Sequence, residues 1–405
     1  MTASRRAPVT PGDPSIYRRL GVRTVVNARG NATLAGGTLM DPEVVAAMAE
    51  AARSFVRIGD LQEAAGELIA EQTGAEAGYV TTGAAAALTL GSAAILAGLD
   101  PERMDRLPDT AGAPDGILVQ RTHRNPYDHA VRAAGARLVE FGDDRGGTAA
   151  EMTRRIDPAI AGAFFHGQAE AAGLSIAAFV GVAHAHGLPV LVDASMNLPP
   201  RGDLRRFIDA GADLVAFSGG KTIGGPQASG FLAGRRELLL SVGLQQQDMD
   251  VLPVTWARRG LLEHGVLPRP PQHGIGRSMK TGKEEIVGLM VALRRYAEHD
   301  EAATQARWLE IVTRLAADLA AIAGLTCTVE PAQADGRPVP MAIVRVDPHT
   351  YGRTAVELVR FLETLDPIVM VGDHDAEAGL LRLDPENLDD RGVTAIVAAL
   401  RAAAA

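Results

Sequence analysis

The hydrophobic and polar positions of this chain change their period many times, and each change predicts a new helix or strand. Short apolar runs bounded by turn residues are typical of strands, whereas apolar residues that recur every three or four positions are typical of helices. The predicted strands of the first two thirds are 78–83, 117–120, 137–141, 161–165, 189–193 and 213–218. The predicted helices begin at Asp41 and continue with 62–72, 84–96, 125–134 and 176–186. This alternation predicts an α/β fold with a mostly parallel sheet.

The pattern changes after about residue 275. A proline-rich turn at 268–272 precedes two long helical patterns, one from about residue 283 to beyond residue 298 and one over 303–322. Beyond them, predicted strands (325–330, 341–346 and 380–383) alternate with predicted helices (354–365 and 391–402). Such a mixture predicts a small α+β domain. We therefore divide the chain into an N-terminal tail and helical arm (1–60), a large domain (61–275) and a smaller C-terminal α+β domain (276–405).

Composition excludes several classes of protein. The 405 residues are 47% hydrophobic and 22% charged, as in ordinary globular enzymes. A formal net charge of −9 argues against a nucleic-acid partner, and no apolar run reaches the ~20 residues of a membrane helix. The start lacks the apolar core of a signal peptide, and Cys327 is the sole cysteine, so we expect a cytoplasmic protein. The alternating pattern around Cys327 predicts a buried side chain and not a nucleophilic thiol.

The segment 212–230 carries the most informative residue of the chain. There an apolar strand ends at Ser218, and two glycines, Lys221 and a second glycine-rich turn follow. A lysine among small residues at the end of a buried strand is suited to form an imine with an aldehyde cofactor, because desolvation lowers the pKa of its amine. Pyridoxal 5′-phosphate (PLP) is the candidate cofactor. The alternative is a lysine in a solvated loop, with the glycines serving a tight turn.

A carboxylate ends the preceding strand of the predicted sheet. Asp193 closes the apolar run 189–193, and ligands of α/β sheets lie beyond the carboxyl ends of the strands. An aspartate that keeps the pyridine nitrogen of PLP protonated makes the ring an electron sink. A turn-forming or helix-capping aspartate is the alternative. The combination of Asp193 with Ser218 and Lys221 favours a cofactor site.

Two further segments supply groups for such a site. The segment 81–84 lies between a strand and a helix N-terminus, where backbone N–H groups and the helix dipole favour a phosphate; a plain helix cap is the alternative. His123 follows another strand, and its imidazole is suited to stack on a cofactor ring and to transfer protons. The spacing of His123, Asp128 and His129 matches no strong metal-ligand motif, so we expect no metal.

A glycine-rich loop at 272–283 gathers three cations just before a helix. Cations are favoured at helix C-termini, so a cluster at an N-terminus needs an explanation. A carboxylate or phosphate of the substrate, held by Arg277 and Lys280, is one explanation. Solvated pairing with Glu284 and Glu285 is the other.

Together these segments resemble the selenium-transferase-like branch of fold type I PLP-dependent enzymes, a branch that includes ammonia lyases and selenocysteine synthase. The matching pieces span most of the chain from Tyr17 onward and comprise 23–30, 80–84, 119–129, 191–193, 217–226 and 276–284. Taken singly, only the pieces 217–226 and 276–284 are specific for the family. Their joint presence is what carries the resemblance.

The resemblance implies a large domain with a mostly parallel seven-stranded sheet, and a homodimer or higher homo-oligomer. Lys221 would carry the cofactor and act as the general base at Cα, Asp193 would pair with the pyridine nitrogen, and His123 would lie against the ring. The residues that would hold the phosphate are Thr82, Gly83, Ala84 and Ser218. The residues that would hold the substrate are Arg277, Lys280 and Arg29.

The resemblance also bears on the reaction. The match begins at Tyr17, which leaves no room for the extra tRNA-binding domain of selenocysteine synthase, so we expect a small-molecule amino-acid substrate. We expect a lyase that removes the Cα proton of a small acidic or phosphorylated amino acid, eliminates a β-substituent and releases ammonia and a 2-oxo acid. The alternatives are a racemase or epimerase, an aminotransferase and, from a different class, a non-catalytic PLP-binding protein.

Overall fold

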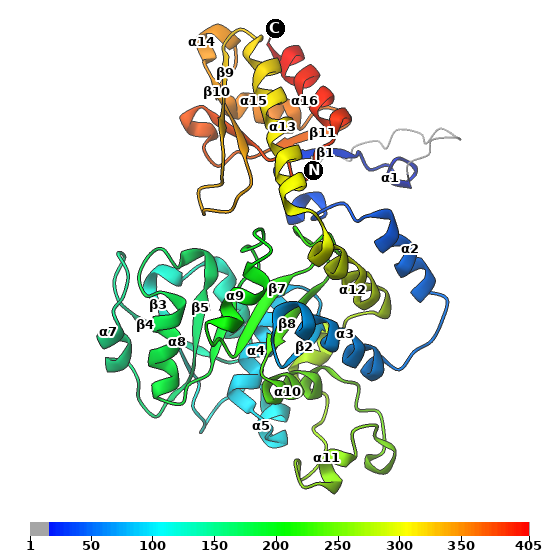
Figure 1. Ribbon diagram of the computed structural model, residues 1–405, viewed down its shortest axis with the longest axis vertical. Helices are drawn as coiled ribbons and strands as arrows, with labels where there is room; N and C mark the ends of the chain where they lie inside the picture. The colour runs from blue at the N-terminus through cyan, green and yellow to red at the C-terminus, as the bar shows by residue number, and fades with distance from the viewer. Residues whose placement is uncertain (1–15, 405) are drawn as a thin grey trace, which may run out of the picture. The chain divides into compact units, whose positions relative to one another are not determined.

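A computed structural model describes residues 16–404 of the chain, so most of the predicted tail lies outside the described residues. The chain divides into a large unit, 40–299, and a small unit that joins 1–39 to 300–405 (Figure 1). These boundaries differ from the predicted 60/61 and 275/276. Helix α12 (Lys283–Glu298) buries its apolar face against α2 (Pro42–Ala51) in the large unit, and β1 (Val25–Ala28) pairs with β11 (Ile368–Val371) in the small one.

A seven-stranded sheet forms the centre of the large unit. Its order is β2-β8-β7-β6-β5-β3-β4, and every neighbouring pair is parallel except the two that involve β8. The strands are β2 (Ala77–Thr81), β3 (Gly116–Gln120), β4 (Arg137–Phe141), β5 (Ile160–His166), β6 (Val190–Asp193), β7 (Leu214–Ser218) and β8 (Gly230–Gly234). The predicted α/β fold with a mostly parallel seven-stranded sheet is confirmed. The sequence pattern does not predict β8, because the glycines at its two ends are typical of turns.

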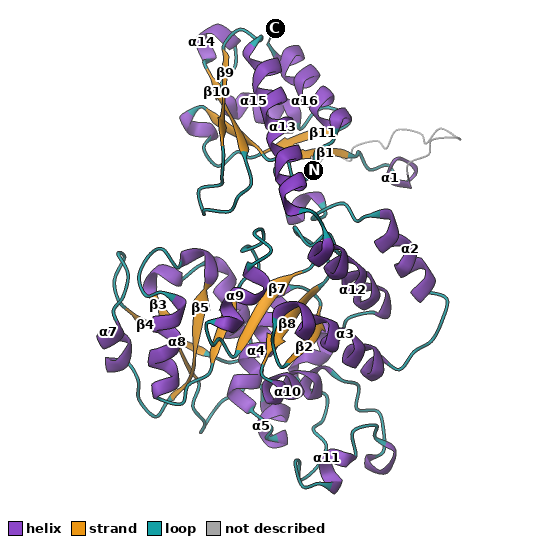
Figure 2. Cartoon of the chain, viewed as in Figure 1, coloured by secondary structure: helices purple, strands orange, loops and turns teal. Residues whose placement is uncertain are grey.

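Helices cover both faces of this sheet (Figure 2). On one face, with α2 and α12, lie α3 (Ile58–Thr73), α7 (Ala149–Arg154), α8 (Ile176–Ala185) and α9 (Asp203–Asp209). On the other face lie α4 (Ala84–Ala97), α6 (His129–Ala133) and α10 (Arg236–Gln246). The short helices α5 (Pro101–Arg106) and α11 (Gly260–Glu263) belong to connecting segments. Because both faces are covered, neighbouring strand residues such as Phe164 and Phe165 enter different cores, which explains why the strands are almost continuously apolar.

The free edge of β2 is covered by helix α3. The side-chain amide of Gln62 donates to the carbonyl of Val80 at 3.0 Å and accepts from its N–H at 3.0 Å, as a neighbouring strand would. One turn later, a Cβ at Gly66 would lie only 2.5 Å from the carbonyl oxygen of Gly78, so the helix backbone approaches the strand closely. These contacts protect an edge that would otherwise invite pairing with another strand.

The small unit is built around a three-stranded antiparallel sheet in the order β12-β10-β9. Its strands are β9 (Leu325–Glu330), β10 (Met341–Val346) and β12 (Leu380–Leu383), and its helices are α1 (Ile16–Arg19), α13 (Glu301–Ala320), α14 (Pro348–Tyr351), α15 (Ala355–Leu362) and α16 (Asp390–Ala403). The two-stranded parallel pair of β1 and β11 shares the core of this sheet and its helices. Across the described part of the chain, none of the helices combines the length and the apolar character that crossing a membrane requires.

Cys327 lies on β9, at the edge of the small sheet, and is half-buried. The sequence predicts a buried side chain, and the edge position explains the partial exposure. Burial raises the pKa of the Cys327 thiol to about 11, so the thiolate is scarce at neutral pH. A nucleophilic cysteine has a lowered pKa and an electropositive setting. The structure therefore agrees with the expectation of a non-nucleophilic thiol.

Asp384 in the small unit is expected to make stability depend on pH. Burial, followed by the charge of Glu386, raises the pKa of Asp384 from 3.8 to about 7. Its carboxyl accepts hydrogen bonds from Nε2 of Gln333 at 3.0 Å and from the N–H of Glu386 at 2.8 Å. Between these two pKa values the folded chain binds a proton that the unfolded chain releases, so the free energy of unfolding should fall as the pH rises from about 4 to about 7.

The substitution Asp384→Asn removes the titration and should flatten this dependence. Urea denaturation, followed through Trp308 of the small unit in a Trp256→Phe background, measures the free energy of unfolding across the same pH interval; these are the two tryptophans of the chain. Equal slopes with pH for the protein with the aspartate and the protein with the asparagine would contradict the assignment.

Candidate active site

The parallel strands of the large unit end along one edge of the sheet, and the predicted chemistry gathers there. At or just beyond the carboxyl ends of the adjacent strands β3, β5, β6 and β7 lie His123, His166, Asp193 and Ser218. Lys221 follows Ser218 after two glycines. Because the carboxyl ends of parallel strands meet at the same edge, the predicted lysine, aspartate and histidine come together.

Asp193 and His166 are neighbours across β6 and β5. They are paired in register. Asp193 is 4% exposed, and its Oδ1 accepts the N–H of Ser195 at 2.9 Å, which is the turn-forming role. Within residues 16–404 its Oδ2 has no hydrogen-bond partner. Burial lowers the pKa of His166, the charge of Asp193 opposes this shift, and the charge of Lys221 adds to it. Both charged side chains therefore act on the same imidazole.

His123 is fully buried, and its ring meets that of Phe165 edge to face with the centroids 4.5 Å apart. Its Nδ1 accepts the backbone N–H of His166 at 3.2 Å, which places the ring proton on Nε2. That Nε2 is buried and makes no well-formed hydrogen bond. Burial, followed by the charge of His166, lowers the pKa of His123 to about 4, and the backbone of Ala169 offsets only part of the shift. His123 is thus a neutral imidazole with an unused donor.

The turn that carries Lys221 is fixed by close contacts of its backbone. The N–H of Gly219 donates to the carbonyl of Ser229 at 2.9 Å. A Cβ at Gly219 would lie 2.3 Å from Oγ of Ser229, and a Cβ at Gly220 would lie 2.4 Å from Cα of Gln227. Packing therefore requires both glycines, as in a tight turn. Lys221 itself is half-buried.

The predicted phosphate cradle is the turn between β2 and α4. Gly83 is the N-cap residue with a φ of 117°, and a Cβ there would meet no atom within 4 Å, so open space borders the turn. The turn rests on β8, where a Cβ at Gly230 would lie 2.8 Å from the nitrogen of Ala84. The hydroxyl of Thr82 donates to the carbonyl of Met279 at 3.3 Å. Thr82 therefore uses its hydroxyl to hold the neighbouring loop.

That loop, a 3-10 helix over Ile275–Met279 and the residues after it, contains the basic cluster. Arg277 forms an ion pair with Asp248 at 3.2 Å, and Lys283 forms one with Glu284. Lys280 is exposed and has no ion-pair partner in the described part of the chain. Pairing with Glu284 thus accounts for one cation of the three, and Lys280 is the cation left for an anionic ligand.

Arg29 lies in the small unit, just after β1. Its guanidinium forms an ion pair with Asp373 at 3.0 Å, and its N–H donates to Oδ1 of Asn27 at 3.0 Å. The groups at the sheet edge belong to the large unit, so Arg29 is not one of them. The assignment of Arg29 to substrate binding stays a prediction.

The groups at the sheet edge fit PLP. A protonated pyridine nitrogen needs a carboxylate oxygen without another partner, and Oδ2 of Asp193, a residue that is 4% exposed, is one among the described residues. A phosphate needs hydrogen-bond donors beside open space, which the helix N-terminus at Gly83 offers together with the hydroxyl of Ser218. The buried Nε2 of His123 makes no well-formed hydrogen bond within the described part of the protein, so its N–H can donate to a ligand. Lys221 supplies the amine that an aldehyde cofactor requires.

Sequence reasoning missed His166. The sequence feature that could have identified His166 is its position directly after the apolar run 161–165. Asp193 is identified by a similar position, at the end of an apolar run. It also missed Thr281, whose hydroxyl is buried next to Lys280 without a hydrogen-bond partner among the residues described. No sequence signal marks Thr281, because a threonine in a polar loop is ordinary.

Comparison with known proteins places this geometry among PLP-dependent relatives. The model of the L-seryl-tRNA selenium transferase family matches residues 168–250, which contain Asp193 and Lys221. A 5′-C-glycyluridine monooxygenase-decarboxylase from Streptomyces sp is 34% identical over 391 residues, or 94% of this chain and 90% of that protein. D-glucosaminate-6-phosphate ammonia lyase from Salmonella typhimurium is 32% identical over 395 residues, which cover 96% of this chain and 97% of that protein. A solved structure of a D-glucosaminate-6-phosphate ammonia-lyase has a TM-score of 0.81 at 31% identity and covers 97% of this chain and 98% of that one.

Proposed function

The chain belongs to the selenium-transferase-like branch of fold type I PLP-dependent enzymes, and we propose that it is an ammonia lyase for an amino acid with an anionic group. Its cofactor is pyridoxal 5′-phosphate. The observation that carries the proposal is the row of His123, His166, Asp193 and Lys221 along the carboxyl edge of the sheet. Nearly full-length similarity to the Salmonella ammonia lyase supports the choice of reaction.

Each residue of the row has a task in such a reaction. When bound, PLP supplies a ring that accepts the negative charge developing at Cα. Lys221 would hold the cofactor and then remove the Cα proton as general base. Asp193 would set a carboxylate against the pyridine nitrogen, and His123 would donate a hydrogen bond from Nε2. Burial favours the neutral form of His166, so an imidazolium would not compete with the pyridine nitrogen for Asp193.

The substrate class follows from charge. Lys280 is exposed without an ion-pair partner among the described residues, and Arg277 lies three positions before it. The hydrogen bond from Thr82 to the carbonyl of Met279 ties their loop to the cradle at the N-terminus of α4. A carboxylate or phosphate at the far end of the amino acid would meet these cations. The Salmonella relative is named for such a substrate, since D-glucosaminate 6-phosphate is a phosphorylated amino acid.

The substitution Arg277→Ala is expected to raise KM by a factor of tens and to change kcat much less. A hydrogen bond to a charged group contributes about 1.5–3 kcal/mol, and a contact made equally in the ground and transition states appears in KM. The matched control is Arg269→Ala, which breaks an ion pair with Asp105 of 2.7 Å outside the site. An unchanged KM for the Arg277 variant would mean that Arg277 serves only its ion pair with Asp248.

A second candidate reaction is an oxygen-dependent decarboxylation. The relative from Streptomyces sp is named a monooxygenase-decarboxylase, and its similarity to this chain is as extensive as that of the lyase. Both reactions break a bond at Cα, so the row of catalytic groups does not separate them. They differ in what they consume and release.

The test is to incubate the holoenzyme with D-glucosaminate 6-phosphate without oxygen and without an amino acceptor. The lyase should release ammonia and a 2-oxo acid in equal amounts, measured by coupled dehydrogenase assays. Turnover that requires oxygen and releases carbon dioxide would replace the lyase by the decarboxylase. Turnover that requires a 2-oxo acid acceptor would indicate an aminotransferase, and inversion at Cα without ammonia would indicate a racemase.

We also propose a homo-oligomer that works in the cytoplasm. Large hydrophobic side chains such as Phe55, Leu252 and Val254 are exposed on the isolated chain, and apolar surface of this kind is typical of subunit contacts. The single cysteine, Cys327, makes an internal disulfide impossible and suits a reducing compartment. Light scattering coupled to size-exclusion chromatography measures the mass, and a value of 42.4 kDa would contradict the oligomer.

A further inference from the structure

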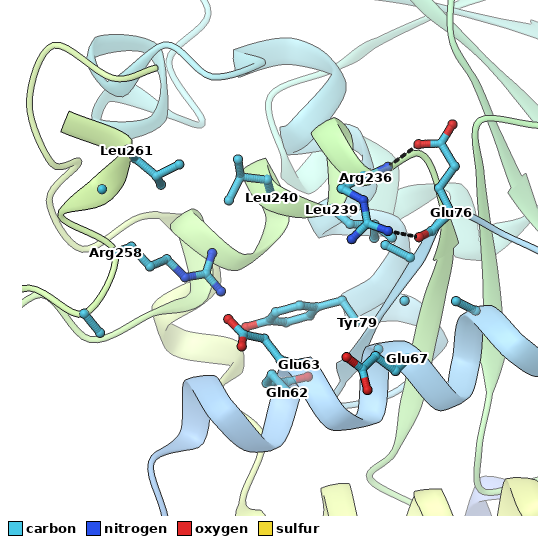
Figure 3. A pocket seen from close by; sticks show the side chains of 16 residues that line it. Gln62, Glu63, Glu67, Glu76, Tyr79, Arg236, Leu239, Leu240, Arg258 and Leu261 are labelled. Carbon is cyan, nitrogen blue, oxygen red and sulfur yellow. Dashed lines mark hydrogen bonds between the residues drawn. The ribbon is translucent and has the colours of Figure 1, made fainter. Parts of the chain in front are cut away.

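A cavity of about 760 Å³ opens in the large unit away from the candidate active site (Figure 3). Its walls are α3, the first residues of β2, the start of α10 and the segment 257–261. Strands β2 and β7 both run antiparallel to β8, so the start of β2 lies at the amino edge of the sheet, whereas Lys221 follows the carboxyl edge. The volume is in the range of pockets for small molecules. No residue of the candidate active site lines it.

One wall presents a positive charge. Arg258 is half-buried and has no ion-pair partner in the part of the chain that the structure describes. Its guanidinium and the ring of Tyr79 pack over Gly243, where a Cβ would lie 3.2 Å from Nη1 of Arg258 and 3.2 Å from the ring of Tyr79. The two side chains come from different elements and point toward one another (Figure 3). An unpaired guanidinium beside a phenol hydroxyl is suited to a carboxylate.

The opposite wall presents negative charge. Glu63 and Glu67 lie one turn apart on α3, and neither has an ion-pair partner among residues 16–404. By contrast, the carboxylate of Glu76, the third acid of the lining, accepts the backbone N–H of Arg236 at 3.0 Å, and the backbone carbonyl of Glu76 accepts Nη2 of Arg236 at 2.6 Å. The lining also includes the apolar side chains Leu239, Leu240 and Leu261, which lie on the side of α10 and α11 (Figure 3).

We propose that this cavity binds a free amino acid with an apolar side chain, at a site separate from the active site. Arg258 and the hydroxyl of Tyr79 would hold its carboxylate, and Glu63 with Glu67 would hold its ammonium group. The side chain would lie against the three leucines. A lining that carries charges of both signs and apolar side chains complements a zwitterion better than a simple anion or cation, each of which would leave one kind of charge unmatched.

The experiment titrates the holoenzyme with L-leucine in a Trp308→Phe background, so that Trp256 is the sole tryptophan. Trp256 is 3% exposed and directly precedes the segment 257–261, which makes its fluorescence a local reporter. We expect a saturable change that leaves the cofactor absorbance unaltered. The analogue 4-methylpentanoate lacks the ammonium group and 3-methylbutylamine lacks the carboxylate, so each should bind at least about tenfold more weakly.

Matched variants assign the signal to the cavity. Arg258→Gln and Glu63→Gln should each raise the Kd for L-leucine at least about tenfold. The controls are Arg259→Gln and Glu71→Gln, which alter exposed neighbours outside the lining and should leave the Kd unchanged. If Arg258→Gln does not fold, Leu240→Phe fills the cavity without removing a charge and should weaken binding as well.

Three outcomes would overturn the proposal. The first is the absence of a saturable change with L-leucine. The second is an unchanged Kd in the folded cavity variants, and the third is a fluorescence change that follows the cofactor absorbance at every concentration, which would place the leucine in the active site. If Arg258→Gln forms a smaller oligomer than the unsubstituted protein and neither protein binds L-leucine, the cavity is a subunit contact, and the ligand site is equally refuted.

Discussion

Replacing Lys221 with alanine is expected to abolish the absorbance of the lysine-bound cofactor near ~420 nm and to reduce turnover by at least about 10³-fold. The chain has only three lysines, Lys221, Lys280 and Lys283. Among them Lys221 alone follows a strand at the carboxyl edge of the sheet, beside Asp193 and His166. Borohydride reduction of the wild-type holoenzyme and peptide mapping of the adduct should therefore identify the peptide that contains Lys221.

The matched control is Lys283→Gln. The Nζ of Lys283 donates to the carbonyl of Ala51 at 2.7 Å and pairs with Glu284, so its loss should lower stability without removing the absorbance. Normal turnover by Lys221→Ala, or an adduct on Lys280 or Lys283, would refute the assignment. Loss of absorbance in both variants would mean that the Lys283 contacts, and not the amine of Lys221, decide whether the cofactor is retained.

Asp193→Asn is expected to lower kcat by about 10²–10³-fold while the cofactor stays bound. The asparagine keeps the Oδ1 that accepts the N–H of Ser195, so the turn after β6 should persist. What it lacks is the negative charge that would hold a proton on the pyridine nitrogen and so allow the ring to accept charge from Cα. Steady-state kinetics with the absorbance spectrum of the same sample measure both effects.

A buried carboxylate of equal exposure provides the comparison for this variant. Asp213, like Asp193, is 4% exposed, but it lies at the amino edge of the sheet, where its Oδ2 accepts the N–H of Val190 at 2.7 Å and its Oδ1 pairs with Arg235 at 3.2 Å. Asp213→Asn should cost stability and leave the kcat of the folded fraction nearly unchanged. A similar fall of kcat in both variants would show that burial, and not position at the site, governs the effect.

Most of the regular structure is predictable because it is determined locally. Strands β9, β10 and β12 begin and end at the predicted residues, and α12 begins at the predicted Lys283, since the apolar pattern of each lies within its own segment. The predicted helix 125–134 is shorter in the structure, because Pro126 and the capping side chain of Asn125 first form a 3-10 turn and α6 begins only at His129. Strands β1 and β11 are not predicted: each is four residues long and depends on a remote partner.

Part of the candidate site can likewise be predicted from the sequence, and part depends on residues far away along the chain. Asp193 and Lys221 are recognisable from sequence because the end of an apolar run marks the edge of a parallel sheet. The protonation of His123 is not recognisable, because it depends on the backbone N–H of His166, 43 positions away. Arg277 likewise pairs with Asp248, 29 positions before it, whereas the sequence points to Glu284 and Glu285 as its partners. Tertiary partners of this kind decide the chemistry of a side chain and leave no local pattern.

The pairing of β1 with β11 has a consequence for the order of events during synthesis. Arg23, just before β1, donates from Nη1 to the carbonyl of Leu365, 342 positions along the chain. At about 5–20 residues per second, the ribosome needs roughly 20–70 s to make that partner after β1 has emerged. Residues 40–299, inserted between the two halves of the small unit, have all their strand partners long before. Nascent chains halted near residue 300 should therefore already protect the large sheet from proteolysis while β1 remains open to cleavage.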